Sequence, residues 1–220
     1  MTWIKICGTT NLGDALTAVQ AGADALGFVF YEKSPRKIDR ASAGEIVKNL
    51  PPKIEKVGVF VDEPVEKILN TVAHAGLTAV QLHGSQSRKP EFIEALKIGR
   101  DLKLFVVLPA TEISGDPGWS VDGESGISAV FFDSGTPQLP GGTGRTFDWK
   151  TAASGIRRIS EKLKVVVAGG LNSTNVADAI RILRPWGVDV ASGVEARPGK
   201  KDPLKVRAFI DAVRKLEKKS

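Results

Sequence analysis

The chain has 220 residues, 42% of them hydrophobic and 25% charged, a composition that predicts a globular protein with a hydrophobic core and excludes a disordered one. Much of the net charge of +6 lies in residues 214–219, and no aromatic-rich basic stripe accompanies it, so we expect no nucleic-acid partner. A single cysteine excludes an internal disulfide, and no apolar run approaches the roughly 18 residues of a membrane span, so we expect a cytoplasmic protein without a membrane partner.

Eight short apolar runs rich in β-branched residues are the predicted strands. They begin near Trp3, Ala25, Lys56, Ala79, Leu104, Ala129, Val165 and Asp189. Their starts are 22 to 36 residues apart, which leaves room for a strand, a helix and two loops. Six stretches between or after them repeat apolar residues with the period of a helix. These stretches are 12–19, 43–50, 65–72, 152–163, 176–183 and 206–213.

Several predicted strands are apolar on consecutive residues, which indicates that both faces are covered, as in a parallel sheet. Eight such strands with a helix after nearly every one predict an α/β fold, a closed (β/α)8 barrel in which residues 1–220 form a single catalytic domain. The glycine- and proline-rich stretch 109–125 predicts a short or irregular fifth helical segment.

The chemistry of such a barrel lies at the carboxyl ends of its strands. Cys7 ends the first predicted strand, Arg36 lies in the loop after the second, His83 ends the fourth and Asp133 ends the sixth. Without further information a lone cysteine is usually a small buried hydrophobe, Asp133 can cap a turn, and Arg36 can be an ordinary surface residue. We interpret His83 as a substrate contact or a structural residue. His74 is the one other histidine, so the chain has too few ligands for a histidine metal site and we expect no metal.

Glycines follow the last predicted strands, where barrels commonly bind a phosphate with backbone N–H groups. The expected phosphate-binding residues are Gly142, Gly144, Gly169, Gly170, Ser192 and Gly193. Glycine allows the backbone to approach a ligand closely, although the same residues are also typical of tight turns.

Four motifs in order along the chain resemble the phosphoribosylanthranilate isomerase family. They are KICG at 5–8, QLHG at 81–84, GGTG at 141–144 followed by FDW at 147–149, and SGVE at 192–195 followed by PGKKD at 198–202. Each is weak alone, but together they extend from the first strand to the eighth and make the resemblance specific.

The resemblance implies a cofactor-independent isomerase of tryptophan biosynthesis. Its reaction is the Amadori rearrangement of N-(5-phosphoribosyl)anthranilate, a small phosphosugar–anthranilate substrate, to the open-chain 1-deoxyribulose phosphate isomer. The family's general base then corresponds to Cys7 and its general acid to Asp133, while Arg36 is the candidate for holding the anthranilate carboxylate bidentately.

These roles require particular environments. A free thiol is only a few per cent ionised at neutral pH, so we expect Cys7 to be assisted by a cation such as Lys5 or Arg36. Asp133 must keep its proton near neutrality, and the apolar run before it would desolvate its carboxyl group.

Two other functions compete with this interpretation. A histidine-pathway aminoaldose isomerase would be expected to carry an aspartate where Cys7 stands, and a non-catalytic phosphate-binding barrel would not need Cys7 and Asp133 together. The family includes monomers and homodimers, and the sequence favours neither. It also assigns no role to Asp62, Asp189 or Glu195, and it leaves 109–125 and 134–146 as candidate lids.

Overall fold

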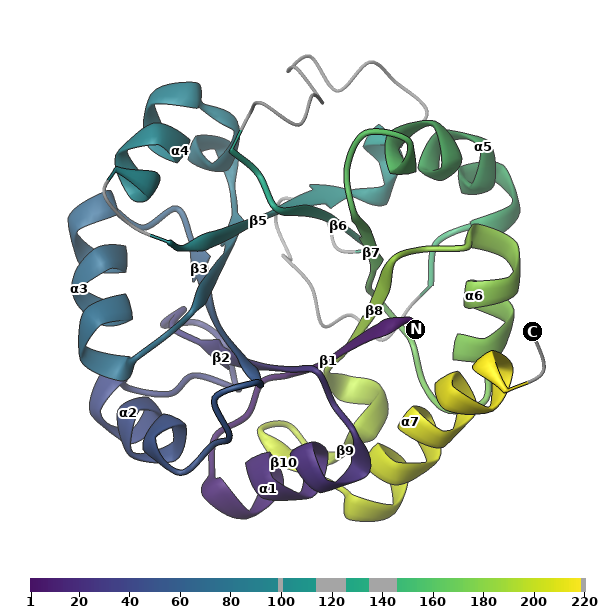
Figure 1. The fold of residues 1–220 in the computed structure, drawn as a ribbon, viewed down its shortest axis with the longest axis horizontal. Helices are drawn as coiled ribbons and strands as arrows, with labels where there is room; N and C mark the ends of the chain where they lie inside the picture. The colour runs from purple at the N-terminus through teal and green to yellow at the C-terminus, as the bar shows by residue number, and fades with distance from the viewer. Residues whose placement is uncertain (99–100, 114–125, 135–145, 219–220) are drawn as a thin grey trace.

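The computed structural model describes residues 1–98, 101–113, 126–134 and 146–218, and it confirms the predicted closed barrel of eight parallel strands (Figure 1). The strands pair in chain order and the eighth pairs with the first. They are β1 Trp3–Cys7, β2 Ala25–Val29, β3 Glu55–Val61, β4 Ala79–His83, β5 Lys103–Pro109, β6 Ala129–Asp133, β7 Val165–Val167 and β8 Gly187–Val190. Five begin at the predicted residue, β3 and β5 begin one residue earlier, and β8 begins two residues earlier.

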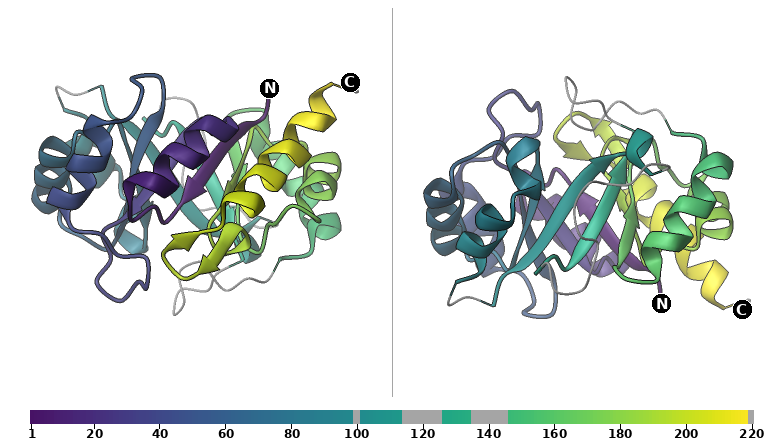
Figure 2. Two further views of the ribbon diagram at one scale, coloured as in Figure 1. Left: turned by 90° about the horizontal axis from the view of Figure 1, so that it is seen from below. Right: turned by 90° about the horizontal axis from the view of Figure 1, so that it is seen from above.

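The helices form one ring around the barrel (Figures 1 and 2). They are α1 Leu12–Ala21, α2 Arg40–Lys48, α3 Val65–Ala75, α4 Pro90–Lys97, α5 Trp149–Ser160, α6 Val176–Leu183 and α7 Pro203–Glu217. The periodicity predicted all of them except α4, which has eight residues and fully buries only Ile93 and Leu96. After β5 the described chain forms the short 3₁₀ helix η2, Ala110–Glu112, and residues 114–125 lie outside the described residues. None of the helices in the described ranges is both long and apolar enough to cross a membrane.

A small hairpin in the connection between β8 and α7 was not predicted. Its strands are β9 Glu195–Arg197 and β10 Lys200–Lys201, and the 3₁₀ helix η3, Ser192–Val194, precedes it. Pro198-Gly199, between the two strands, is a recognised turn dipeptide that could have revealed the hairpin. Gly199 has a φ of +77°, which favours glycine.

The barrel interior changes character along its axis. An apolar layer containing Trp3, Phe105 and Phe131 fills the end at which the strands begin, and these rings pack edge-on or tilted against one another. Farther along β1 the interior becomes polar, with Lys5 opposite Asp189 of β8 in the pairing register. The apolar layer therefore lies below a polar layer, which is directly beneath the carboxyl ends of the strands.

Candidate active site

A cavity of about 190 Å³ opens at the carboxyl ends of the strands. Four residues predicted from the sequence line it together: Cys7, Arg36, His83 and Asp133. They come from β1, the loop after β2, the end of β4 and the end of β6, so the fold brings them together from four separate parts of the chain. Gln81 and Asp189 also line the cavity.

Cys7 is a free thiol at the end of β1 and is buried. Burial raises the pKa of this thiol above its ordinary value, and the positive charges of Lys5 and Lys201 only partly oppose that rise. The predicted assistance from a cation is therefore present as Lys5, but the effect of burial on the thiol pKa outweighs it.

Lys5 and Asp189 form an ion pair inside the barrel. The Lys5 Nζ atom lies 3.0 Å from Asp189 Oδ1, and the lysine side chain has no solvent exposure. Burial alone would lower the pKa of Lys5, but the charges of Asp189 and Cys7 raise it above its ordinary value. The Nζ atom also lies 5.6 Å from the centre of the Phe131 ring, a cation–π distance. Asp189, which had no predicted role, is thus the counter-ion of a protonated lysine.

Arg36 makes a bidentate ion pair with Glu195 of β9. Its Nε donates to Glu195 Oε1 at 2.9 Å and its Nη2 donates to Oε2 at 2.8 Å. Burial acts to raise the pKa of Glu195, but hydrogen bonds and charge from Arg36 and Lys201 bring it below its ordinary value. Arg36 lines the cavity as expected, and Glu195 fixes the direction of its guanidinium group.

Lys201 is a buried lysine that sequence reasoning missed. Its Nζ donates to the carbonyl oxygen of Cys7 at 2.5 Å, to that of Ala191 at 3.2 Å and to Glu195 Oε1 at 3.0 Å. Burial lowers the pKa of Lys201, although Glu195 opposes this shift. The hairpin containing Lys201 therefore anchors the end of β1 that carries the thiol.

Asp133 ends β6 and lines the same cavity as Cys7. The hydroxyl of Ser134 donates to Asp133 Oδ1 at 3.5 Å, a long contact. Phe131, two residues before Asp133 on the same face of β6, has no solvent exposure and is an apolar neighbour of the kind expected from the sequence.

His83 occupies a position between the cavity and a smaller hollow of about 10 Å³, which has room for about one water molecule. Burial and the charge of Lys5 lower the pKa of His83 to about 4. Its Nε2 lies 3.3 Å from the amide nitrogen of Gln81, a contact in which a neutral ring accepts the hydrogen bond. A ring that is neutral and weakly basic fits a substrate contact or a structural role, as expected, better than proton transfer.

The lowered pKa of His83 predicts how stability changes with pH. Between its folded pKa of about 4 and its ordinary value of 6.5, the unfolded chain binds a proton that the folded protein does not. The free energy of unfolding should therefore decrease as the pH falls through that interval. Urea unfolding at several pH values should show a smaller decrease for His83→Gln than for the original protein. Equal slopes for the two proteins would contradict the assignment.

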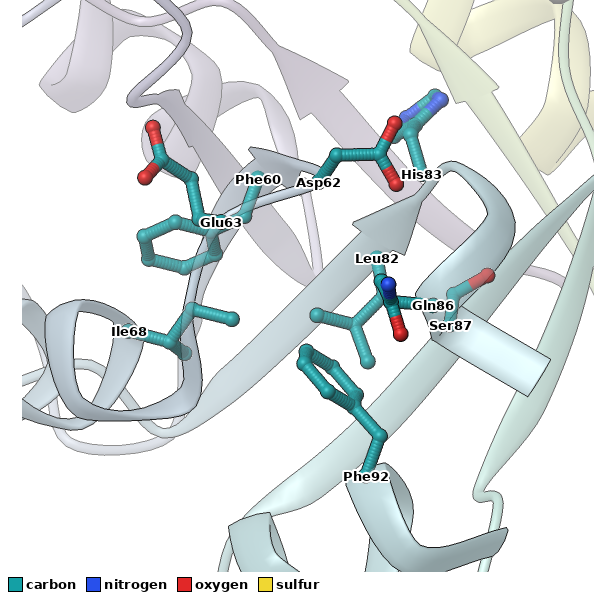
Figure 3. Close-up of a pocket in the computed structure, with 9 residues that line it drawn as sticks. All are labelled: Phe60, Asp62, Glu63, Ile68, Leu82, His83, Gln86, Ser87 and Phe92. Carbon is teal, nitrogen blue, oxygen red and sulfur yellow. The ribbon is translucent and has the colours of Figure 1, made fainter. Parts of the chain in front are cut away.

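Asp62 lies at the end of β3, beside the end of β4 (Figure 3). Its φ of +47° is unusual for a residue with a side chain, and its N–H donates to the carbonyl oxygen of His83 at 3.2 Å. A Cβ atom on Gly84 would collide with the Asp62 carboxylate. Asp62 therefore packs over Gly84 and lines the smaller hollow.

The glycines expected to hold phosphate lie where the chain is tightly packed. Gly169 and Gly170 follow β7 with φ values of +81° and +64°. A Cβ atom on Gly169 would lie 2.3 Å from the hydroxyl oxygen of Ser134, and one on Gly193 would lie 1.9 Å from the carbonyl oxygen of Leu171. Ser192 begins η3, directly before Gly193. A positive φ at Gly169 and Gly170 and close packing at Gly169 and Gly193 thus account for these glycines without a ligand, while Gly142 and Gly144 lie outside the described residues.

Gly193→Ala is expected to destabilise the protein by about 1–3 kcal/mol or more, because the new methyl group would have to displace backbone. Gly13→Ala is the matched control, since its Cβ atom would meet only an ordinary contact, 3.5 Å from Asn11, inside α1. That control should be neutral or stabilising, because alanine favours a helix over glycine. Urea unfolding of both variants tests this, and equal stabilities would show that the loop after β8 relaxes easily.

The described residues contain no group of three or more histidine, cysteine, aspartate or glutamate side chains arranged to hold a metal ion. A buried thiol beside an ammonium group, opposite a carboxyl group on β6, can provide one base and one acid across a small substrate.

Comparisons with known proteins point to one family. The family model of N-(5'-phosphoribosyl)anthranilate (PRA) isomerase matches residues 4–212. The N-(5'-phosphoribosyl)anthranilate isomerase of Pelobacter propionicus is 46% identical over 220 residues, which are 100% of this chain and 99% of the relative. A phosphoribosyl anthranilate isomerase solved with reduced 1-(o-carboxyphenylamino)-1-deoxyribulose 5-phosphate is 36% identical, with a TM-score of 0.79 over 98% of this chain and 100% of that one. A structure of monomers generated from the dimeric Thermotoga maritima isomerase is also 36% identical, with a TM-score of 0.80 over the same shares.

Proposed function

Because the chain belongs to the N-(5'-phosphoribosyl)anthranilate isomerase family, and is therefore an isomerase of tryptophan biosynthesis, we propose that Cys7 and Asp133 carry out its proton transfers. The observation that supports this assignment most directly is that both residues line one cavity at the carboxyl end of the barrel. Residues 1–220 then form one catalytic domain, as the match over residues 4–212 suggests.

The reaction requires one acid and one base. Asp133 gives a proton to the ring oxygen of the ribose, the ring opens to a Schiff base, and the thiolate of Cys7 removes the proton from C2. The resulting enolamine loses its C2 hydroxyl proton and gains a proton at C1, which gives the ketose. The two protons gained, at the ring oxygen and C1, balance the two lost from C2 and its hydroxyl group, so the substrate is isomerised without a net change in composition.

The substrate has two charged ends, the anthranilate carboxylate and the phosphate, and these would set its orientation in the cavity. Arg36, held by Glu195, is our candidate for the anthranilate carboxylate, because Nη1 lies outside the bidentate pair and has no hydrogen-bond partner within the described residues. The backbone at Gly169, Gly170, Ser192 and Gly193 is the candidate for the phosphate, with Gly142 and Gly144 completing it. His83 would contact the substrate between these ends.

We propose that the chain is a monomer or a homodimer, and the dimeric isomerase of Thermotoga maritima supports the second. The mechanism needs a reduced Cys7, which supports a reducing, cytoplasmic setting. The same residues work with protons alone, so we propose no cofactor.

The decisive test follows the loss of phosphoribosylanthranilate fluorescence on mixing the substrate with the protein or with Asp133→Asn. The protein should consume the substrate, and the variant should be slower by about 10²–10⁴-fold, the usual contribution of a general acid. A protein that binds the substrate without turnover would be a phosphate-binding barrel, and turnover of the histidine-pathway aminoaldose alone would indicate the rival isomerase. Undiminished turnover by Asp133→Asn would contradict its assignment as the acid.

A further inference from the structure

Lys5 is placed inside the barrel by strand geometry. It lies two residues before Cys7 on β1, and residues two apart on a strand share a face, so both side chains enter the interior. The register puts Asp189 of β8 opposite Lys5 on one side, while Gly27 of β2 lies opposite Cys7 on the other. A buried lysine in this layer requires a function or a compensating partner, since burying an ammonium group is costly.

Gly27 shows how closely the thiol and the ammonium group approach each other. A Cβ atom at this position would lie 2.8 Å from Cys7 Sγ and 3.0 Å from Lys5 Nζ, so both atoms lie around the same point. The backbone of Gly27 does not have the positive φ found at eight other glycines of the described chain, so conformation does not explain the residue. The missing side chain leaves the space in which the two groups meet.

We propose that Lys5, oriented by Asp189, is a positioning residue that supplies the counter-charge of the Cys7 thiolate, and that Gly27 keeps the space between them open. The inference deepens the proposed function, because it rests on Cys7 acting as the general base. When the thiolate takes the C2 proton it becomes a neutral thiol, and Lys5 keeps its own proton throughout.

The other charged groups around Cys7 are less well placed for this role. Lys201 directs its ammonium group to the carbonyl oxygen of Cys7 and to Glu195, and Arg36 is paired with Glu195. His83 is neutral near pH 7, and Asp189 opposes thiolate formation. The cavity is also lined by Asp133, the proposed acid, and by Tyr31 and Lys33 on the loop after β2. Lys5 therefore provides a positive charge that lies beside the Cys7 sulfur, favours its thiolate and is held in place by Asp189.

The chain has one cysteine, so thiolate formation can be measured directly at Cys7 without activity. The experiment follows thiolate ultraviolet absorbance against pH and the rate of alkylation by iodoacetamide. For Lys5→Met we expect the apparent thiol pKa to rise by about one unit or more, with an about tenfold slower alkylation at neutral pH. Lys5→Arg should recover much of the loss, because it restores the charge.

One further variant tests the arrangement by size. Gly27→Ala should separate the pair and slow alkylation. The matched control is Lys56→Met, which removes another buried lysine whose ammonium group is bonded to the carbonyl oxygens of Pro51 and Pro52.

Unchanged titration and alkylation in Lys5→Met, or changes equal to those in Lys56→Met, would overturn the inference. If Lys5→Met does not fold, Lys5→Gln decides it, because glutamine removes the charge but can still hydrogen-bond to Asp189, and an unchanged thiol pKa there would count against the inference. These readouts are independent of the proposed function. Turnover that survives replacement of Cys7 would refute its role as the base, while the titration would still report whether Lys5 stabilises the thiolate.

Discussion

Cys7→Ser is expected to reduce kcat by at least about 10²–10⁴-fold, the usual contribution of a general base. Serine replaces the thiol with a hydroxyl group that does not ionise at neutral pH, so no base faces C2 of the substrate. Lys5, Asp189 and Arg36 remain in place, and substrate binding should change much less than kcat. Steady-state kinetics with the fluorescent substrate would show a large loss in kcat and a small change in KM.

Two controls separate chemistry from folding in this experiment. The thermal unfolding temperature of Cys7→Ser should stay close to that of the original protein, because serine nearly preserves the side-chain volume at this site. Thr17→Ser on α1, whose hydroxyl donates to Gly13, should leave kcat unchanged. A Cys7→Ser protein that retained kcat within about tenfold would assign the base to another residue.

Glu195→Leu is expected to be the most destabilising substitution near the site, at about 3–5 kcal/mol. The Glu195 side chain is 4% exposed and neutralises both Arg36 and Lys201, whose side chains are 13% and 1% exposed. Removing the carboxylate leaves two buried cations facing each other without a counter-ion. Glu195→Gln keeps an acceptor oxygen and should cost less. Urea unfolding near neutral pH measures these differences.

The control for this prediction is an exposed ion pair. Glu45→Ala removes the partner of Lys48 on the surface of α2, where such pairs contribute about 0–1 kcal/mol. The Glu195 effect should also depend on pH, because its folded pKa is lowered. The stabilisation by Glu195 is fully present above its ordinary pKa of 4.5 and is lost as the pH falls through the folded value. The difference in free energy of unfolding between the original protein and Glu195→Leu should therefore shrink in acid. A loss no larger than that of Glu45→Ala would show that Arg36 and Lys201 find other partners.

The strands were predictable because of their position in the barrel. A strand covered on both faces, such as β7, consists of consecutive valines, and this local signal does not depend on which strand lies beside it. The helices with long amphipathic faces were predictable for a similar reason. Helix α4 and the β9–β10 hairpin are short, and the hairpin strand β10 has only two residues, too few for periodicity to detect.

The candidate site was predictable in part for a different reason. The rule that chemistry lies at the carboxyl ends of barrel strands placed Cys7 and Asp133 among the candidates, and the family resemblance supplied their roles as base and acid. The partner of Lys5 was not predictable in this way, since Asp189 lies 184 residues later and reaches it only through the register of the first and last strands. The contacts of Glu195 with Arg36 and of Lys201 with Cys7 were unpredictable for the same reason, because they form only when the end of the chain packs against its beginning.

That return links the time course of folding to the appearance of the site. The contacts from Lys5 to Asp189, from Arg36 to Glu195 and from Lys201 to the Cys7 carbonyl oxygen span 184, 159 and 194 residues. Contacts of such high sequence separation form late, because the entropy of closing a long loop must be overcome first. A nascent or partly folded chain can therefore build its first strands and helices without assembling these ion pairs. The charge arrangement around the thiol appears only when the eighth strand joins the first, so the reactivity of Cys7 can report the final closure of the barrel.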